Sequence, residues 1–209
     1  MVTVYKRFQM TRPPRNSQIT GNGESTLSTK KIYILLTKFA DARGRLLSIL
    51  TGSYYTHASL GLEEDPNTFY SFVLKGFRVE KLNRYLKPGR EPFPVKLYEI
   101  EVPQKTYEKI KEKINYFVAY KSRMHYTTVG LILSLLRIPY QRKFTYFCSQ
   151  FVAHILQQAG IVPAHHKPAL YLPQDLSDVP GTKLLFSGNM QTLFVYLGMM
   201  MPAEYTVKT

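Results

Sequence analysis

The sequence predicts one α+β domain in which an antiparallel β-sheet packs against helices. Short β-favouring runs separated by turn residues fill most of the first half of the chain, whereas apolar residues at helical spacing mark much of the second half. The length of 209 residues and the hydrophobic content of 44% suit a single domain with its own core. The chain has no internal repeats, which favours one domain over an array.

The expected strands are bounded by turn residues. The apolar run at residues 31–38 is the first, and the turn-like residues 63–67 separate the second and third strands as a hairpin. Residues 93–102 alternate between polar and apolar side chains, as a strand does. In full, we expect strands at residues 31–38, 56–62, 68–74, 79–82, 93–102, 183–187 and 193–197.

The main helices are expected in the second half of the chain. Pro103 is suited to open the first, in which apolar residues recur at helical spacing and predict one face packed on the sheet. Further helices are expected at residues 42–50, 127–136, 146–159 and 173–176.

The formal net charge of +14 favours an anionic partner, either a polymer or a membrane surface, although it also serves solubility. Nothing in the sequence resembles a specific nucleic-acid motif. Residues 1–29 are expected to be a flexible basic arm, broken by Pro and Gly, ahead of a domain at residues 30–209.

The sequence also bears on compartment. A single cysteine excludes an intramolecular disulfide, and no secretory signal is visible. The longest apolar runs, residues 127–136 and 192–201, are about half of the roughly 20 residues that a membrane-spanning helix needs. We therefore expect a cytoplasmic protein, with peripheral association with a membrane as an alternative.

The cysteine, Cys148, falls in the first turn of a predicted helix. Unpaired backbone N–H groups and the helix dipole stabilise a thiolate there, and the same N–H groups could hold an oxyanion. Phe151, Val152 and Ile155 share the helix face of Cys148, so the thiol should point into the domain. The alternative is an ordinary core cysteine.

A thiol nucleophile needs a base, and the chain has five histidines. His57 lies in a predicted strand, on the same face as Ser59 and Gly61, whose small side chains leave room for a substrate. His154 follows Cys148 on the same helix and should point elsewhere. The remaining three are His125, which has no assigned place, and His165 and His166, which share a Pro-flanked loop without a convincing third metal ligand.

The imidazole also needs a polar group to orient it. If the hairpin turn centres near Asp65, Ser71 lies across from Ser59 and diagonal to His57, on the same face. A register one residue different would present Tyr70 instead.

Three segments together resemble the permuted NlpC/P60 proteins: residues 55–60 (YTHASL), 70–72 (YSF) and 147–152 (FCSQFV). The pattern is closest to the YiiX/YaeF-like papain-fold amidases and more distantly similar to the lecithin retinol acyltransferase group. In the permuted members the strand histidine precedes the cysteine, as it does here. Residues 172–176 (LPQDL) resemble the TP-x-D element of the family, with Leu172 in place of threonine. The resemblance covers roughly residues 30–187.

The resemblance implies a circularly permuted papain-like fold, and we expect no cofactor. It implies Cys148 as nucleophile and His57 as base, and places the third polar position, often Glu or His in the family, on Ser71. For substrate binding we select Tyr70, Ser59, Tyr146, Gln150 and Asp175, the last of which could instead cap a helix.

The function expected is that of a cysteine-nucleophile hydrolase that cleaves an amide bond, of peptide or peptidoglycan type, or an ester bond through an acyl-enzyme. Two alternatives stay open. One is a lipid-directed thiol acyltransferase or hydrolase at a membrane surface, and the other is a catalytically inactive binding module on the same fold.

Overall fold

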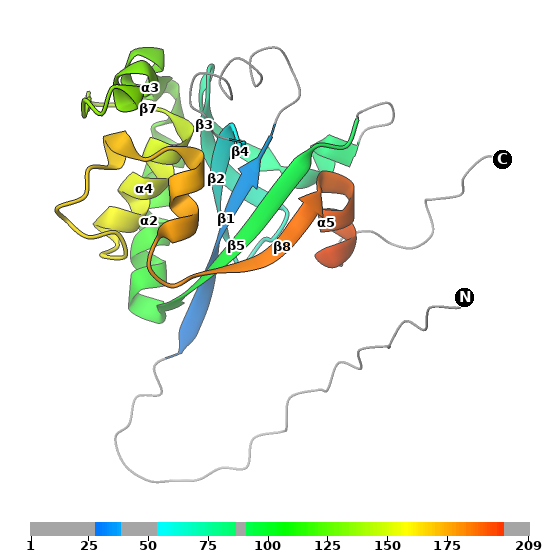
Figure 1. Cartoon of the computed structure of the whole chain (residues 1–209). Helices are drawn as coiled ribbons and strands as arrows, with labels where there is room; N and C mark the ends of the chain where they lie inside the picture. Colours follow the sequence, from blue (N-terminus) through cyan, green and yellow to red (C-terminus); the bar gives the residue numbers. More distant parts are fainter. Residues whose placement is uncertain (1–27, 39–53, 87–90, 199–209) are drawn as a thin grey trace, which may run out of the picture.

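A six-stranded antiparallel sheet forms the centre of the protein in this computed structural model, which describes residues 28–38, 54–86 and 91–198 (Figure 1). The strand order is β4-β3-β2-β1-β5-β8, and each neighbouring pair is antiparallel. The strands are β1 (Thr29–Thr37), β2 (His57–Leu62), β3 (Thr68–Val73), β4 (Gly76–Lys81), β5 (Pro94–Pro103) and β8 (Thr182–Asn189). The expected α+β class and antiparallel sheet are thereby confirmed.

Two helices cover one face of this sheet and a third packs on the other (Figure 1). The first face carries α2 (Gln104–Ala119) and α4 (Cys148–Gln158), and the second carries α5 (Met190–Tyr196). A short helix, α3 (Thr128–Leu135), lies beyond them between two short paired strands, β6 (His125–Tyr126) and β7 (Thr145–Tyr146). The 3₁₀ turns are η1 (Leu82–Leu86), η2 (Lys121–Arg123), η3 (Pro168–Leu170) and η4 (Pro173–Asp178).

Strand alternation divides the buried residues into two cores. In β1, Ile34 and Leu36 face α2 and α4, while Leu35 between them faces α5. The helical spacing seen in the sequence accounts for the larger core, because the apolar stripe of α2 and that of α4 both lie in it. Their buried members are Tyr107, Ile110, Ile114, Phe117, Phe151, Val152 and Ile155.

Two expectations about the elements need correction. Residues 193–197 are not a strand but belong mostly to α5, because the Asn189 side chain accepts a hydrogen bond from the Thr192 backbone N–H and caps a helix. The helix expected at 146–159 begins two residues later, at Cys148, since Tyr146 is held in β7. The helix expected at 42–50 lies outside the described residues, as does the expected arm except for residues 28 and 29.

Within the described ranges, no helix combines the length and the apolar character needed to cross a membrane.

Candidate active site

Cys148 is the first residue of α4, and a buried glutamine fixes the start of that helix. The Gln150 side chain accepts a hydrogen bond from the Phe147 backbone N–H at 3.2 Å. Its amide nitrogen donates to the carbonyl oxygen of Tyr140 and to the side-chain oxygen of Gln141. Gln150 therefore ties the preceding segment to the helix tip and sets the position of the thiol.

Cys148 is 5% exposed, and hydrogen-bond donors surround its sulfur. It is hydrogen-bonded to the His57 ring and to the backbone N–H groups of Ala58 and Ser149. Burial raises the pKa of the thiol, but the His57 ring and the two backbone donors outweigh it, so the net shift lowers the pKa. These groups favour the thiolate, the form that acts as a nucleophile.

The contact between Cys148 and His57 is made at the start of β2, which pairs with β1 there but lies beyond the ladder with β3. The side chain of Ala58 lies in the core beneath α4, so alternation directs the neighbouring His57 away from that helix. However, the ladder between β2 and β3 covers only the pairs Leu60–Tyr70 and Gly61–Phe69. The first residues of β2 therefore have no ladder bonds to β3, which leaves the Ala58 N–H to meet the sulfur.

His57 connects the sulfur to a buried carboxylate. Its Nε2 lies 3.2 Å from Oε1 of Glu80, which leaves Nδ1 as the ring nitrogen for Cys148. Burial lowers the pKa of His57, but the charges and hydrogen bonds of Glu80 and Cys148 outweigh it and raise the pKa to about 10. At neutral pH the geometry thus supports a thiolate–imidazolium pair.

Glu80, on β4, is 3% exposed and is held by two hydroxyl groups. Ser71 donates to its Oε1 at 2.5 Å, and Tyr85 donates to its Oε2 at 3.3 Å. Burial raises the pKa of this carboxyl, but His57 and then Ser71 outweigh it, so the net shift lowers the pKa. The buried group is therefore a carboxylate that faces the imidazolium.

The structure changes the expected role of Ser71. The observed pairs of β2 and β3 match the expected register, which would put Ser71 opposite Ser59. The carboxylate beside His57 is nevertheless Glu80, and Ser71 donates to it. Sequence analysis missed Glu80, although strand alternation in β4 puts it on the face opposite Phe77 and Val79. A single acidic residue on the face opposite the apolar residues of this strand was the signal in the sequence that could have identified Glu80.

The other residues selected for substrate binding have different surroundings. Tyr146 is buried among aromatic rings, with its centroid 5.2 Å from that of Phe72, and Tyr70 is half-buried beside Phe77. Ser59 is fully buried, and its hydroxyl has no hydrogen-bond partner among the described residues. Asp175 accepts from the Leu172 backbone N–H at 2.8 Å and caps η4, the alternative considered for it.

Tyr126 is a further residue near the sulfur that sequence analysis did not select. Burial, and then the charge of Cys148, raise the pKa of its phenol. The hydroxyl therefore stays protonated and can donate a hydrogen bond beside the thiolate. A two-residue strand gave no sequence signal for this placement.

The remaining histidines lie apart from this cluster. His154 packs against the ring of Tyr146, whereas the rings of His165 and His166 contact each other on the surface. His125 lies on β6 and is exposed. In the described part of the chain, no group of three or more His, Cys, Asp or Glu side chains is placed to hold a metal ion.

The site is thus a buried cysteine–histidine–glutamate chain on an α+β fold, which is the arrangement a thiolate nucleophile requires. Comparison with known proteins shows the fold. YiiX from Escherichia coli O157:H7, described as a metalloprotein, superposes with a TM-score of 0.50 and 13% sequence identity. The match covers 76% of this chain and 97% of YiiX. No family model and no curated protein sequence matches the chain.

Proposed function

We propose that this protein is a cysteine-nucleophile hydrolase with a circularly permuted papain-like fold of the NlpC/P60 type. The observation that carries the proposal is the chain of contacts from Cys148 through His57 to Glu80. Burying a thiolate, an imidazolium and a carboxylate together costs desolvation free energy, which a purely structural core could avoid with apolar residues. Their alignment at a helix N-terminus matches the needs of nucleophilic catalysis.

The geometry supports a two-step reaction at a carbonyl group. The Cys148 thiolate attacks the carbonyl carbon, and the oxygen takes up the negative charge beside the N-terminal N–H groups of α4. The imidazolium of His57 then gives its proton to the departing amine or alcohol, leaving an acyl-enzyme. Neutral His57 next takes a proton from water, the resulting hydroxide releases the acid, and Glu80 stabilises the imidazolium that is regenerated.

The proposed substrates are amides of peptide or peptidoglycan type and esters. A second candidate, transfer or hydrolysis of a lipid acyl group, is favoured by the exposed apolar residues of α3. Within either substrate class, hydrolysis and transfer differ in product: hydrolysis releases a free acid, whereas transfer yields an acylated acceptor. Mass spectrometry of the products, with and without an amine or alcohol acceptor, separates them.

The test of the proposal is the pH dependence of thiol alkylation. An ordinary thiol, with a pKa of about 8.5, is less than about 1% thiolate at about pH 6. We expect iodoacetamide to label Cys148 at about pH 6 at a rate close to that at pH 8. The label is located by peptide mass spectrometry, with Cys148→Ser as the blank.

A rate that falls in proportion to an ordinary thiolate fraction would reject the thiolate–imidazolium pair and favour an inactive binding module. A second arm measures hydrolysis of a panel of amide and ester substrates by the wild-type protein and by Cys148→Ala. Turnover that survives in Cys148→Ala would assign the chemistry to another group.

A further inference from the structure

The segment between β6 and β7 projects from the domain with its two ends held side by side. His125 pairs with Thr145 and Tyr126 with Tyr146 in a parallel ladder. Residues 127–144, which include α3, therefore form a loop whose two ends lie side by side at this ladder. We call these residues the α3 excursion.

The α3 excursion exposes a row of large apolar side chains. Val129, Ile132 and Leu136 are 59%, 50% and 64% exposed, and their spacing of three and four residues places them on one face of the helix. Ile138, just beyond the helix, is also 50% exposed. The opposite face, which includes Leu131 and Ser134, is buried. A surface helix normally turns polar residues outward, so this arrangement indicates a face made for an apolar partner.

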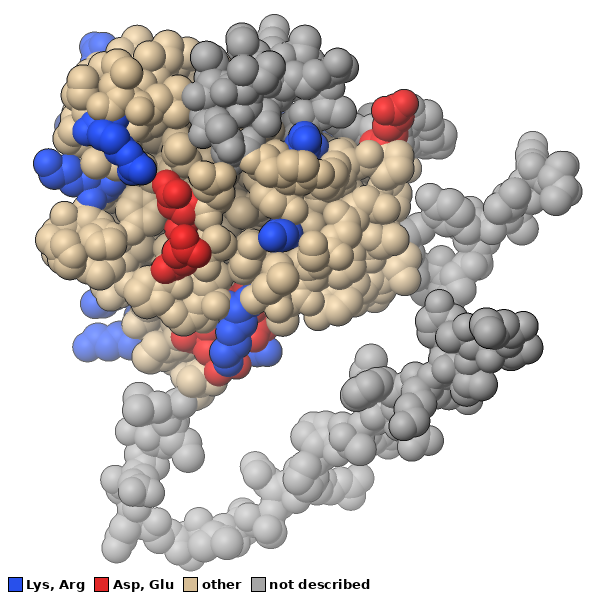
Figure 2. Space-filling view, in the orientation of Figure 1, with Lys and Arg blue, Asp and Glu red and all other residues tan. Residues whose placement is uncertain are grey.

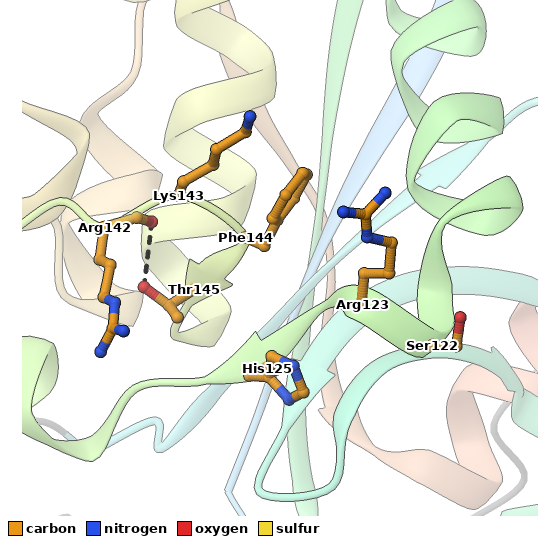
Figure 3. Close-up of a pocket in the computed structure, with 7 residues that line it drawn as sticks. All are labelled: Ser122, Arg123, His125, Arg142, Lys143, Phe144 and Thr145. Carbon is orange, nitrogen blue, oxygen red and sulfur yellow. Dashed lines mark hydrogen bonds between the residues drawn. The ribbon is translucent and has the colours of Figure 1, made fainter.

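Cations gather at the base of the excursion. Arg123, Arg142 and Lys143 line a hollow of about 500 Å³, to which His125 also contributes (Figure 3). Arg123 and Lys143 lie on either side of the Phe144 ring, 5.2 and 5.0 Å from its centroid (Figure 3). No carboxylate lines this hollow, and none in the described ranges forms an ion pair with these three cations.

We propose that the α3 excursion docks on an anionic phospholipid bilayer. Ile132 and its apolar neighbours would enter the interface between headgroups and acyl chains, while the cations at the base bind lipid phosphates. At the upper left of Figure 2, the surface over α3 carries no charged side chain, and Lys and Arg side chains lie at its edge.

The combination of charge and apolar surface favours an anionic bilayer over a soluble anion or a second copy of the chain. A soluble anion could fill the cationic hollow, but it would leave the apolar row in water. A second copy of the chain could cover the apolar row, but it would bring two sets of unpaired cations together in a protein of net charge +14. An anionic bilayer satisfies both features at once.

The inference extends to the proposed function, because β7 leads directly into α4. Only Phe147 separates the ladder residue Tyr146 from Cys148. If the protein is the hydrolase proposed above, docking would hold the thiolate close to the membrane. The enzyme would then favour amide or ester substrates that carry an acyl chain. Docking itself needs no catalysis, so Cys148→Ser should bind vesicles as the wild type does.

The test is co-sedimentation of the full chain with phosphatidylcholine vesicles, with or without about 30 mol% phosphatidylglycerol. We expect binding to the anionic vesicles alone, weakening as salt rises from about 0.1 M to about 0.5 M. The double variant Ile132→Asn/Leu136→Asn should bind at least about tenfold more weakly. Its matched control is Leu74→Asn/Leu184→Asn, at positions 55% and 53% exposed, which should bind as the wild type does.

Charge is tested by a second pair of variants. Arg123→Gln/Arg142→Gln should weaken binding about fivefold per cation, the factor that corresponds to about 1 kcal/mol. Lys105→Gln/Lys109→Gln removes the same charge from exposed sites on α2 and should change it much less.

Three results would overturn the proposal. Equal weakening by both charge variants, together with no effect of the α3 change, would mean adsorption by net charge. A wild-type dimer that the α3 variant dissociates, seen by light scattering, would assign the face to a second copy. Equal wild-type binding to neutral and anionic vesicles would remove the role of the cations.

Discussion

The end of β2 and the α3 excursion depart from the usual distribution of side chains in opposite ways, because the first buries ionisable groups and the second exposes apolar ones. At the end of β2, a thiol, an imidazole and a carboxylate are each about 95% or more buried, and every charge faces another. On the α3 excursion, apolar side chains are half exposed or more, and the cations at its base form no ion pair with a carboxylate in the described part of the chain. β7 joins the α3 excursion to α4, whose first residue is Cys148.

The difference separates two physical tasks. Paired, buried charges cost desolvation free energy but hold reacting atoms in one arrangement, which suits chemistry. Exposed apolar groups beside free cations bury their surface only against a partner, which suits binding. Changes in one region should therefore alter reaction rates and changes in the other should alter binding, each with little effect on the other property.

The largest expected effect is that of Cys148→Ala on turnover. Loss of the nucleophile should lower kcat by at least about 10³-fold, because no other thiol exists in the chain to replace it. Vesicle binding, measured by sedimentation, should stay near that of the wild type. A parallel loss of vesicle binding would show that the two regions are not independent.

The next effect compares two buried carboxylates of the sheet. Glu80→Gln removes the charge that holds His57 as an imidazolium, so the alkylation rate of Cys148 at about pH 6 should fall about 10- to 100-fold. Glu99→Gln is the matched control, because Glu99 is 6% exposed but pairs with Lys31 instead. If both variants lower the rate equally, the effect is structural and Glu80 has no specific role.

Glu80 was not predicted from the sequence, although much of the surrounding structure was. Apolar periodicity predicted the sheet, α2 and the first turn of α4, because local patterns determine which faces are buried. The placement of Cys148 at the helix tip and of His57 at the start of a strand came from the same patterns. For the orienting group, the register of β3 led to Ser71, one hydrogen bond away from the carboxylate.

What the sequence could not supply was the pairing of strands and the capping of short elements. Glu80 meets His57 only because β4 pairs with β3 and places its acid beside the site. The apolar run after Asn189 favours a strand by composition, but it forms α5 because the Asn189 side chain caps the helix N-terminus. Tyr126 lies near enough to Cys148 to interact with its charge, and it belongs to a strand of two residues, which is too short to show a periodic pattern in the sequence.

The thiolate–imidazolium pair should make the free energy of unfolding depend on pH. The pKa of His57 is raised to about 10, so its stabilising contribution is complete below about pH 6.5 and is lost as the pH rises through about 10. The pKa of Cys148 is lowered, so its contribution is complete above about pH 8.5 and is lost as the pH falls. Between those values the folded and unfolded pairs bind equal numbers of protons.

The measurement compares the free energy of unfolding of the wild type with that of Cys148→Ala/His57→Gln, by urea titration at each pH. The difference in unfolding free energy should be constant from about pH 6.5 to about 8.5 and should decline on both sides. The slope of each decline against pH should correspond to the uptake or release of at most about one proton on unfolding. A difference that does not vary from about pH 5 to about 10 would mean that the pKa values of Cys148 and His57 are the same in the folded and the unfolded protein, which contradicts the shifts described above. The comparison removes the titration of the many other tyrosines and lysines.

The smallest expected effects come from the two hydroxyl groups that hold Glu80. Ser71 donates at 2.5 Å and Tyr85 at 3.3 Å, so Ser71→Ala should slow alkylation of Cys148 at about pH 6 severalfold and Tyr85→Phe only about twofold. Both variants leave Glu80 in contact with His57, so neither should approach the loss in Glu80→Gln. Equal effects of Ser71→Ala and Glu80→Gln would mean that the serine itself orients the imidazole, as the sequence alone had suggested.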